Sequence, residues 1–384
     1  MKKLLFLVML TSMFGTAHAT RSRMNSLGQD PNQGSFYLMD NRNFFRNPAG
    51  AGKMRNFLVA ELATDYGTNT TPTEGNLEGG YFGEFSSDMA FGIYMGKGDP
   101  VSDLVANAFT NNAPVNPTPT GGENFAFLTS GDANPFNLFL AGGSDMKWGL
   151  DLSFAMTSED RTGGEAKYNS FGLGLGIETS GGLQVYASYN SSTSESGSAA
   201  GPTTPNKLET SGYQVGVIWG LNAETTLFAQ YSGGDSEYNI AANGKANISQ
   251  FIVGVGRIYE LSPTARFNFD LSYNGGEYDP DGNFKWSQST LPLVIGLEAD
   301  AAEWLILRTS IRQNFIIGEY TKDTGNLKTS SNAALTGTRV ALGATLHFGK
   351  LKIDGNLGGF GGVQNTSLFD ATNFFVNAAA TYMF

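Results

Sequence analysis

Few side chains in this sequence have the chemistry of a catalytic or cofactor site. The chain contains no cysteine, which excludes disulfide bonds and thiolate metal ligands. "GLGLG" at Gly172–Gly176 is not followed by a helix that could bind phosphate, and "DPDGN" at Asp279–Asn283 is followed by Thr290 where a calcium loop needs a bidentate glutamate. His347 has no identifiable serine or aspartate partner. The sequence therefore predicts no enzyme, and we expect neither a cofactor nor a metal site.

A more distinctive pattern is the placement of polar and charged side chains at every second position among apolar ones. From Ala265 to Asn274 the apolar residues alternate with Arg266, Asn268, Asp270 and Ser272, and from Trp148 to Met156 they alternate with Asp151 and Ser153. Period two is the spacing of a β-strand with two different faces. We therefore expect the charged side chains to share one face of each strand.

These charged faces predict a wet lumen that sorts solutes by charge. Assigning faces by alternation places cations on late strands and acids on early strands. Candidate pore-lining or constriction residues are Arg266, Asp270, Arg308, Arg312, Arg339 and Lys352, together with Glu61, Asp65, Glu78, Glu84 and Asp151. A basic wall facing acids across a lumen would create a transverse field acting on small hydrophilic solutes. The alternative is that these groups form salt bridges and fill the interior.

The elements that would carry these side chains are about sixteen alternating segments of roughly ten residues, the length of a tilted strand that crosses a bilayer. Their spacers alternate between short turns such as "GSD" and "GK" and long loops rich in Gly, Ser and Asn. The predicted strands are residues 57–66, 76–86, 88–96, 135–143, 146–157, 166–178, 182–191, 209–219, 223–233, 247–259, 263–275, 285–299, 303–315, 333–348, 350–360 and 373–384.

The apolar face recurs on nearly every predicted strand and ends in aromatic residues. Trp148, Trp219, Tyr259 and Phe348 lie near the short turns, and Tyr66, Tyr189, Tyr231 and Tyr273 lie near the long loops. Two aromatic girdles favour a lipid-facing band over the core of a soluble β-sandwich, which would also alternate. The sequence predicts an all-β fold, a transmembrane antiparallel β-barrel with short periplasmic turns and long extracellular loops.

The net charge and residues 1–19 indicate which partners and which compartment to expect. The chain has a formal charge of -11 over 384 residues, and so acidic a protein is a poor nucleic-acid binder. Residues 1–19 combine Lys2 and Lys3, an apolar run and "AHA" at Ala17–Ala19, the pattern of a cleaved signal peptide. We expect cleavage near Ala19, which leaves Thr20 as the first residue.

The final segment carries a family resemblance. In "NFFVNAAATYMF" the alternate residues are apolar and the strand ends on Tyr382 and Phe384. This resembles the assembly signal of bacterial outer-membrane β-barrel proteins, and the mature chain resembles a porin-like barrel. The resemblance implies the outer membrane of a Gram-negative bacterium, with outer-membrane lipid, the barrel-assembly machinery and small solutes as partners. It also implies association as a homotrimer.

Two segments could narrow the lumen. Residues 20–56 contain Asn47, Pro48, Ala49 and Gly50, a turn signal that is similar to the N-terminal plug region of FadL-like transporters of hydrophobic compounds. This segment would either gate the lumen or pack at the periplasmic mouth and stabilise the barrel. The long loop at 97–134 contains apolar residues at helical spacing from Asp99 to Phe109, and it resembles the constriction loop of porins; the alternative is a surface helix.

The sequence thus divides into a signal peptide (1–19), a plug-like segment (20–56) and a barrel (57–384). The expected function is porin-like: passive diffusion of small hydrophilic solutes and ions through a charged channel. One alternative is a FadL-like transporter of hydrophobic compounds, which would need an apolar pocket near the plug. The other is a structural or surface-recognition barrel with a closed lumen.

Overall fold

The computed structural model describes residues 20–63, 76–97, 135–161, 164–196, 206–240, 242–280, 285–316, 320–323, 328–331, 338–360 and 377–384. The signal-peptide prediction (1–19), Asp65, Tyr66, the helix expected at Asp99–Phe109 and most of the "DPDGN" turn lie outside these residues. Among the described residues no helix is long and apolar enough to span a membrane.

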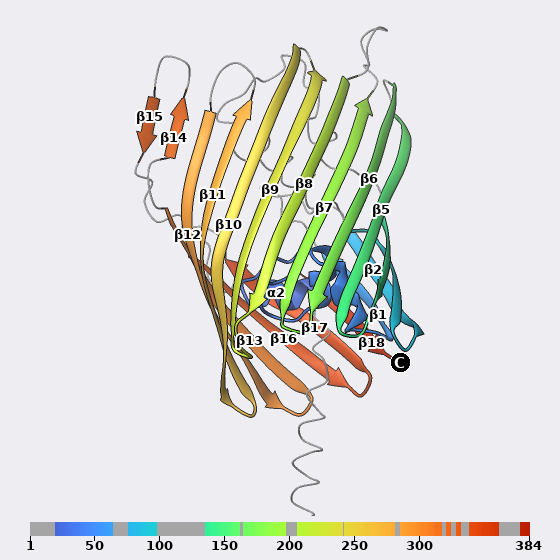
Figure 1. Ribbon diagram of the computed structural model, residues 1–384, viewed down its shortest axis with the longest axis vertical. Coiled ribbons are helices and arrows are strands. Elements are labelled where there is room, and N and C mark those ends of the chain that lie inside the picture. The colour runs from blue at the N-terminus through green and yellow to red at the C-terminus, as the bar shows by residue number, and fades with distance from the viewer. Residues whose placement is uncertain are drawn as a thin grey trace, which may run out of the picture.

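All the strands belong to one antiparallel sheet, which closes on itself to form a barrel (Figure 1). Its strands are β1 (Phe57–Ala63), β2 (Asn76–Ser86), β3 (Met89–Met95), β4 (Phe136–Gly142), β5 (Met146–Arg161), β6 (Gly164–Thr179), β7 (Leu183–Ser196), β8 (Asn206–Gly220), β9 (Thr225–Ile240), β10 (Ala242–Ser262), β11 (Ala265–Pro280), β12 (Lys285–Ala302), β13 (Leu305–Ile316), β14 (Tyr320–Asp323), β15 (Lys328–Ser331), β16 (Thr338–Phe348), β17 (Leu351–Phe360) and β18 (Asn377–Met383).

The barrel has sixteen strands among the described residues, as the alternating segments predict. The sheet contains 18 strands, but β14 and β15 form a hairpin beside the end of β12, and β13 pairs directly with β16. Closure comes from β1, which pairs with β2 on one side and with β18 on the other. The backbone N–H of Phe384 donates to the carbonyl of Asn56 at 2.9 Å, which fixes the end of β18 at this seam.

The two faces of the strands follow the predicted alternation. On β11, Asn268, Asp270 and Ser272 are buried inside the barrel, and on β6 the outward Leu175 and Ile177 are exposed. Trp148, Trp219, Tyr259 and Phe348 are also exposed, at the short-turn end. An apolar outer face of this kind on a closed antiparallel barrel is the architecture of outer-membrane barrels. The apolar side chains contact lipid, and closure leaves no strand edge with unpaired backbone groups.

Tight turns join the strands at the end of the barrel where the chain's C-terminus lies (Figure 1). Three of the turn glycines have positive φ angles: Gly143 (100°), Gly182 (77°) and Gly349 (63°). Glycine adopts this region without a steric penalty, which permits these short connections. We call this the short-turn end, and the opposite end the long-loop end.

The structure differs from the sequence prediction in strand length and in one loop. Strands β5 to β11 extend further toward the long-loop end than predicted, because Ser- and Thr-rich segments such as Ser191–Ser196 remain paired after their apolar alternation ends. The loop predicted between the strands 303–315 and 333–348 contains β14 and β15. These two strands pair with each other, and β14 also pairs with Lys285–Ser287. The pairing forms hydrogen bonds to backbone groups that solvent would otherwise have to satisfy.

Candidate functional site

The lumen is occupied by residues 20–56, which we call the plug segment. It contains the helix α2 (Arg21–Ser26) and the 3-10 helices η1 (Asn41–Phe45) and η2 (Pro48–Gly52), and it lies inside the barrel toward the short-turn end (Figure 1). Each helix has a side-chain cap: Thr20 accepts from the N–H of Arg23, Asp40 from that of Arg42 and Asn47 from that of Ala49. Local capping therefore shapes a segment that has no strand period.

Opposite charges attach the plug segment to the wall. The segment has six basic residues, Arg21, Arg23, Arg42, Arg46, Lys53 and Arg55, and two acidic ones, Asp30 and Asp40. Most of its cations contact carboxylates on inward faces of strands, and Lys53 contacts Glu178 on β6. A basic segment therefore sits inside an acidic barrel.

The early wall, β1 to β4, presents two buried carboxylates to the plug segment. Glu61 of β1 and Glu78 of β2 are directly opposed in register and only 1% and 2% exposed. The guanidinium of Arg42 lies between them, with Nη1 3.4 Å from Glu61 and 3.2 Å from Glu78, and it also donates to the Tyr94 hydroxyl at 2.8 Å. Arg21 adds a second ion pair with Glu78 at 3.2 Å. The arginines of the plug segment thus compensate two facing acids that would otherwise repel each other.

Around this cluster the early wall is apolar on its inward face too. Phe44 and Phe45 of η1 pack on inward aromatic rings, with Phe44 5.0 Å from Phe82 and Phe45 5.3 Å from Phe139 between ring centroids. Phe57, at 0% exposure, stacks on Phe82 at 4.9 Å. Each buried aromatic side chain of this kind contributes about 1.5–3 kcal/mol of burial free energy. The plug segment therefore shares a hydrophobic core with the first strands.

The late wall, which we define as β12 to β17, contains charges that pair with each other. Glu298 of β12 lies opposite Arg308 of β13 and accepts from its Nε at 2.5 Å, and Arg308 also bonds Asp354 of β17 at 3.2 Å. Arg23 of α2 joins Glu298 at 3.0 Å and Asp40 at 3.4 Å. Burial raises the pKa of Asp40 to about 7, although the nearby Arg23 and Arg42 oppose the increase.

Three of the predicted lumen charges, Arg308, Glu61 and Glu78, form salt bridges, which is the arrangement that the alternative describes; the transverse field itself stays a prediction. Arg308 does not face a distant acid but is neutralised within its own wall, and Glu61 and Glu78 are neutralised by the plug segment. Long-range charge separation in a low-dielectric interior is costly, so charges pair with the nearest partner. The cations that pair across the lumen come from residues 20–56 and not from the late strands.

The other predicted lumen residues are placed as follows. Asp270 is buried and accepts from Gln29 at 2.9 Å and from Tyr37 at 3.0 Å, while Glu84 pairs with Arg55 at 3.2 Å near the short-turn end. Arg266 lies 3.8 Å from Glu298. Arg312 faces the lumen opposite Arg339, which is exposed, and Lys352 lies beside His347 in register.

The "NPAG" turn contacts the wall through glycines. Asn47 donates to Gln184 at 3.0 Å, and η2 packs on β5 and β6 where Gly149 and Gly176 face inward. A Cβ at Gly149 would overlap the backbone of Pro48, and one at Gly176 would overlap the Asn47 side chain. The glycine spacing in "GLGLG" thus leaves room for neighbouring side chains and the plug segment, and Leu173 and Leu175 alternate with it.

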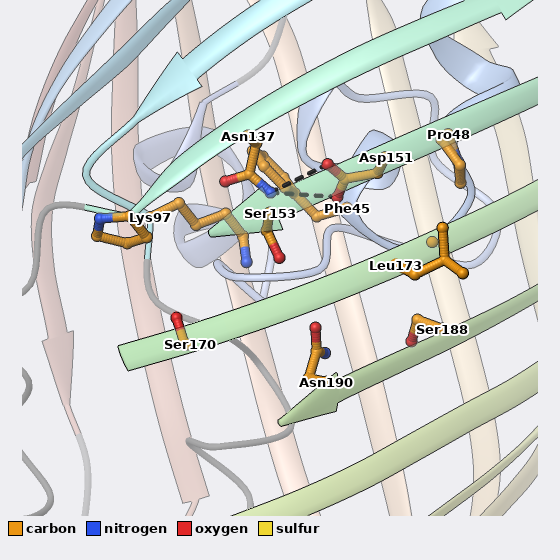
Figure 2. Close-up of a pocket in the computed structure, with 12 residues that line it drawn as sticks. Phe45, Pro48, Lys97, Asn137, Asp151, Ser153, Ser170, Leu173, Ser188 and Asn190 are labelled. Atoms are coloured by element: carbon orange, nitrogen blue, oxygen red, sulfur yellow. Dashed lines mark hydrogen bonds between the residues drawn. The ribbon is translucent and has the colours of Figure 1, made fainter. Parts of the chain in front are cut away.

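A small cavity of about 30 Å³ borders the plug segment beside β4 to β7 (Figure 2). Phe45 and Pro48 form its plug side. Asn137 donates to both oxygens of Asp151 at 3.1 and 3.2 Å, the dashed lines in Figure 2. Ser188 and Asn190 complete a polar wall, so Asp151 lines the lumen as predicted by alternation.

Larger cavities lie on both sides of the plug segment. One of about 370 Å³ is lined by residues 28–34, Gln214, Gln250, Pro292 and Arg312 toward the long-loop end. One of about 120 Å³ is lined by Leu38, Met54, Glu178 and Ile218 toward the short-turn end. The plug segment therefore divides the interior.

Several residues of the candidate site were missed by the sequence analysis. Glu298 and Asp354 occupy inward positions by the same alternation that identified Arg308, and Arg21, Arg23, Arg42 and Arg46 stand in a segment of conspicuously positive charge. That local charge of opposite sign to the whole chain was the available signal. Among the described residues no cluster of His, Asp and Glu is arranged to hold a metal ion.

Comparison with known proteins identifies barrels of similar shape. No family model and no curated protein sequence matches this chain. Among solved structures, the CymD monoaromatic hydrocarbon channel has a TM-score of 0.41 and 11% identity over 97% of this chain and 99% of that chain. The Pseudomonas putida toluene transporter TodX has a TM-score of 0.40 and 10% identity over 95% and 97%. The Acinetobacter baumannii siderophore receptor PiuA has a TM-score of 0.41 and 9% identity over 79% and 57%. At these values the similarities carry no argument about cargo.

Proposed function

We propose that this chain is an outer-membrane transport channel whose lumen is closed at rest by its own plug segment. The observation that supports this most is the ion pairing of Arg42 with both Glu61 and Glu78, deep inside the barrel. A freely diffusing pore of porin type would need this space open. The proposal therefore favours the FadL-like alternative in its gating architecture over an open diffusion porin.

The cargo best suited to the interior is a small amphipathic organic compound. The cavity of about 370 Å³ has the size of a small-molecule site. Phe36, Ile252 and Val294 give it apolar surface, and Gln214 and Gln230 give it polar surface. Mixed lining of this kind accepts a molecule with an apolar body and a polar group.

A second candidate is passage of wholly hydrophobic compounds, such as the monoaromatic hydrocarbons named for CymD. The apolar surface of Phe36, Ile252 and Pro292 favours it. Uptake of toluene and of benzyl alcohol into proteoliposomes separates the candidates, because an amphipathic preference predicts faster entry of the alcohol relative to protein-free vesicles.

The test of the closed lumen is single-channel conductance of the full chain in a planar bilayer. We expect little conductance from the unaltered protein and stable ohmic steps from Arg23→Met/Arg42→Met, which loses arginine contacts on both walls. Arg257→Gln, on an exposed pair with Glu224 at 3.1 Å, is the matched control and should stay silent. Heat-modifiable gel migration reports whether each barrel is folded.

A second test of the closed lumen uses urea on the unaltered protein. Moderate urea should release the plug segment before the barrel unfolds, because the segment is held by side-chain contacts while the barrel is held by continuous backbone pairing. Reversible opening by urea would support the proposal. Stable ohmic steps from the unaltered protein without urea would contradict it and restore the open porin.

A further inference from the structure

Arg46 differs from the other arginines of the plug segment. It stands between η1 and η2, is 4% exposed and lies 3.9 Å over the ring of Phe36. Its Nη2 donates to the carbonyl of Gly34 at 3.3 Å. Its Nε and Nη1 have no hydrogen-bond partner among the described residues. Arg21, Arg23, Arg42 and Arg55 each have a carboxylate within ion-pair distance, and Arg46 has none in the part of the chain that the structure describes.

An unpaired guanidinium in the interior is energetically costly. Removing an ion from water carries a penalty of several kcal/mol, which neighbouring acceptors normally offset. Burial lowers the pKa of Arg46, in keeping with that penalty. The stacking on Phe36 offsets part of it through a cation–π interaction, but the Nε and Nη1 donors keep no hydrogen-bond partner among the described residues.

Arg46 borders a cavity on either side, and a guest would reach its covered Nε and Nη1 donors once the side chain rotates toward one of them. Arg46, Phe36 and Tyr37 line both the cavity of about 370 Å³ on the long-loop side and that of about 120 Å³ on the short-turn side. They form the partition between the two spaces. A solute that crosses the plug segment without displacing it would meet Arg46.

The carboxylates of the larger cavity accept hydrogen bonds within the chain, whereas its two arginines form no ion pair among the described residues. Asp30 attracts both arginines without ion-pair contact, and Asp270 attracts Arg312. Asp30 accepts from the backbone N–H groups of Asn32 and Gln33 at 2.7 and 3.1 Å, and Asp270 accepts from Gln29 and Tyr37. Arg312, the second cation in the lining, donates to Asn314 at 3.4 Å and has no carboxylate within ion-pair distance among the described residues. The donors that remain favour an anionic guest.

We propose that this cavity binds a small organic anion, a carboxylate on an apolar body, whose oxygens accept hydrogen bonds from Arg46. This rests on the proposed function and names the substrate class of the same channel. The apolar body would lie along Phe36, Ile252 and Val294. Phe36 is held in place by parallel stacking on Phe228, with 4.3 Å between centroids. The anion would thus lie at the partition that it must pass.

The test compares two probes of nearly equal shape, benzoate and benzamide, by isothermal titration calorimetry on the purified full chain at neutral pH. A hydrogen bond to a charged group predicts about tenfold tighter binding of benzoate. Arg46→Gln should remove that preference, and Arg46→Lys should keep part of it. The exposed Arg257→Gln should leave it unchanged, which controls for net charge.

The unaltered protein alone can overturn the proposal. Equal affinity for the two probes, or binding of neither, contradicts an anion site at Arg46 whatever the variants do. Retention of the benzoate preference in a folded Arg46→Gln protein also contradicts it. None of these results bears on conductance, so a failed anion site and a failed closed-lumen proposal give separate outcomes.

Discussion

The two walls of the barrel hold the plug segment by different electrostatics. On the early wall, Glu61 and Glu78 face each other across neighbouring strands, and the compensating cations are Arg42 and Arg21 of the plug segment. On the late wall, Glu298 faces Arg308 and is compensated within the sheet before Arg23 adds to it. The early wall needs the plug segment for charge balance, and the late wall does not.

This difference bears on how a plug could move. Release from the late wall leaves the Glu298–Arg308–Asp354 network intact, whereas release from the early wall leaves two buried acids opposed. The early wall also shares an aromatic core with Phe44 and Phe45. Motion that opens a path should therefore begin on the late side, where the larger cavity lies beside Val294 and Arg312.

The largest expected effect is on Arg42. Arg42→Met removes the only side chain that contacts Glu61, Glu78 and Tyr94 together among the described residues. Breaking a buried ion pair by removing one partner costs about 3–5 kcal/mol. We expect a loss of that size in the free energy of unfolding, measured by urea titration in detergent micelles.

Two further variants test whether the early and late walls differ in how they hold the plug segment. Arg42→Met/Glu61→Gln/Glu78→Gln should recover much of the loss, because no unpaired charge remains. Arg23→Met should lower the free energy of unfolding less than Arg42→Met, because Glu298 retains its ion pair with Arg308. Equal losses for Arg23→Met and Arg42→Met would show that the two walls hold the plug segment alike.

A smaller effect is expected where the plug segment contacts the wall without charge. Gly149→Ala places a Cβ against the backbone of Pro48, and overpacking of this kind costs about 1–3 kcal/mol. Limited proteolysis should then cut residues 20–56 sooner. Gly181→Ala, whose added Cβ meets only the Thr179 hydroxyl at 3.8 Å, is the matched control. Unchanged proteolysis of Gly149→Ala would mean that the "NPAG" turn is not held by this contact.

The barrel was predictable from sequence because each strand carries its own signal. Period two in segments such as Ala265–Asn274 fixes which side chains face lipid, and closure needs no further information. The plug segment has no such period. Its path depends on capping by Thr20, Asp40 and Asn47 and on pairing with residues distant in sequence, as in Arg23 with Glu298.

The same reasoning explains why inward positions were identified but their partners were not. Alternation places Arg308 and Glu61 in the lumen correctly, since it depends only on the local backbone. Which acid meets which arginine depends on strand stagger and on the position of residues 20–56. Phe57 and Phe82 were also missed as core residues, because an apolar residue on the inward face breaks the simple rule that apolar side chains face lipid.

The smallest expected effect concerns Asp40, which lies between the two attachments through Arg23 and the backbone of Arg42. Burial raises the pKa of Asp40 to about 7 from an ordinary value of 3.8, so the folded state holds a proton that the unfolded chain has lost. Stability from this group is therefore present below about pH 4 and is lost as the pH rises through about 7, at about 1.4 kcal/mol per unit. We expect the plug segment to resist proteolysis better at pH 6 than at pH 7.5, and Asp40→Asn to flatten that dependence. A reversed profile in the unaltered protein, with better resistance at pH 7.5 than at pH 6, would mean that the carboxyl is ionised and that its pairing with Arg23 dominates, which would make the late attachment the more electrostatic of the two.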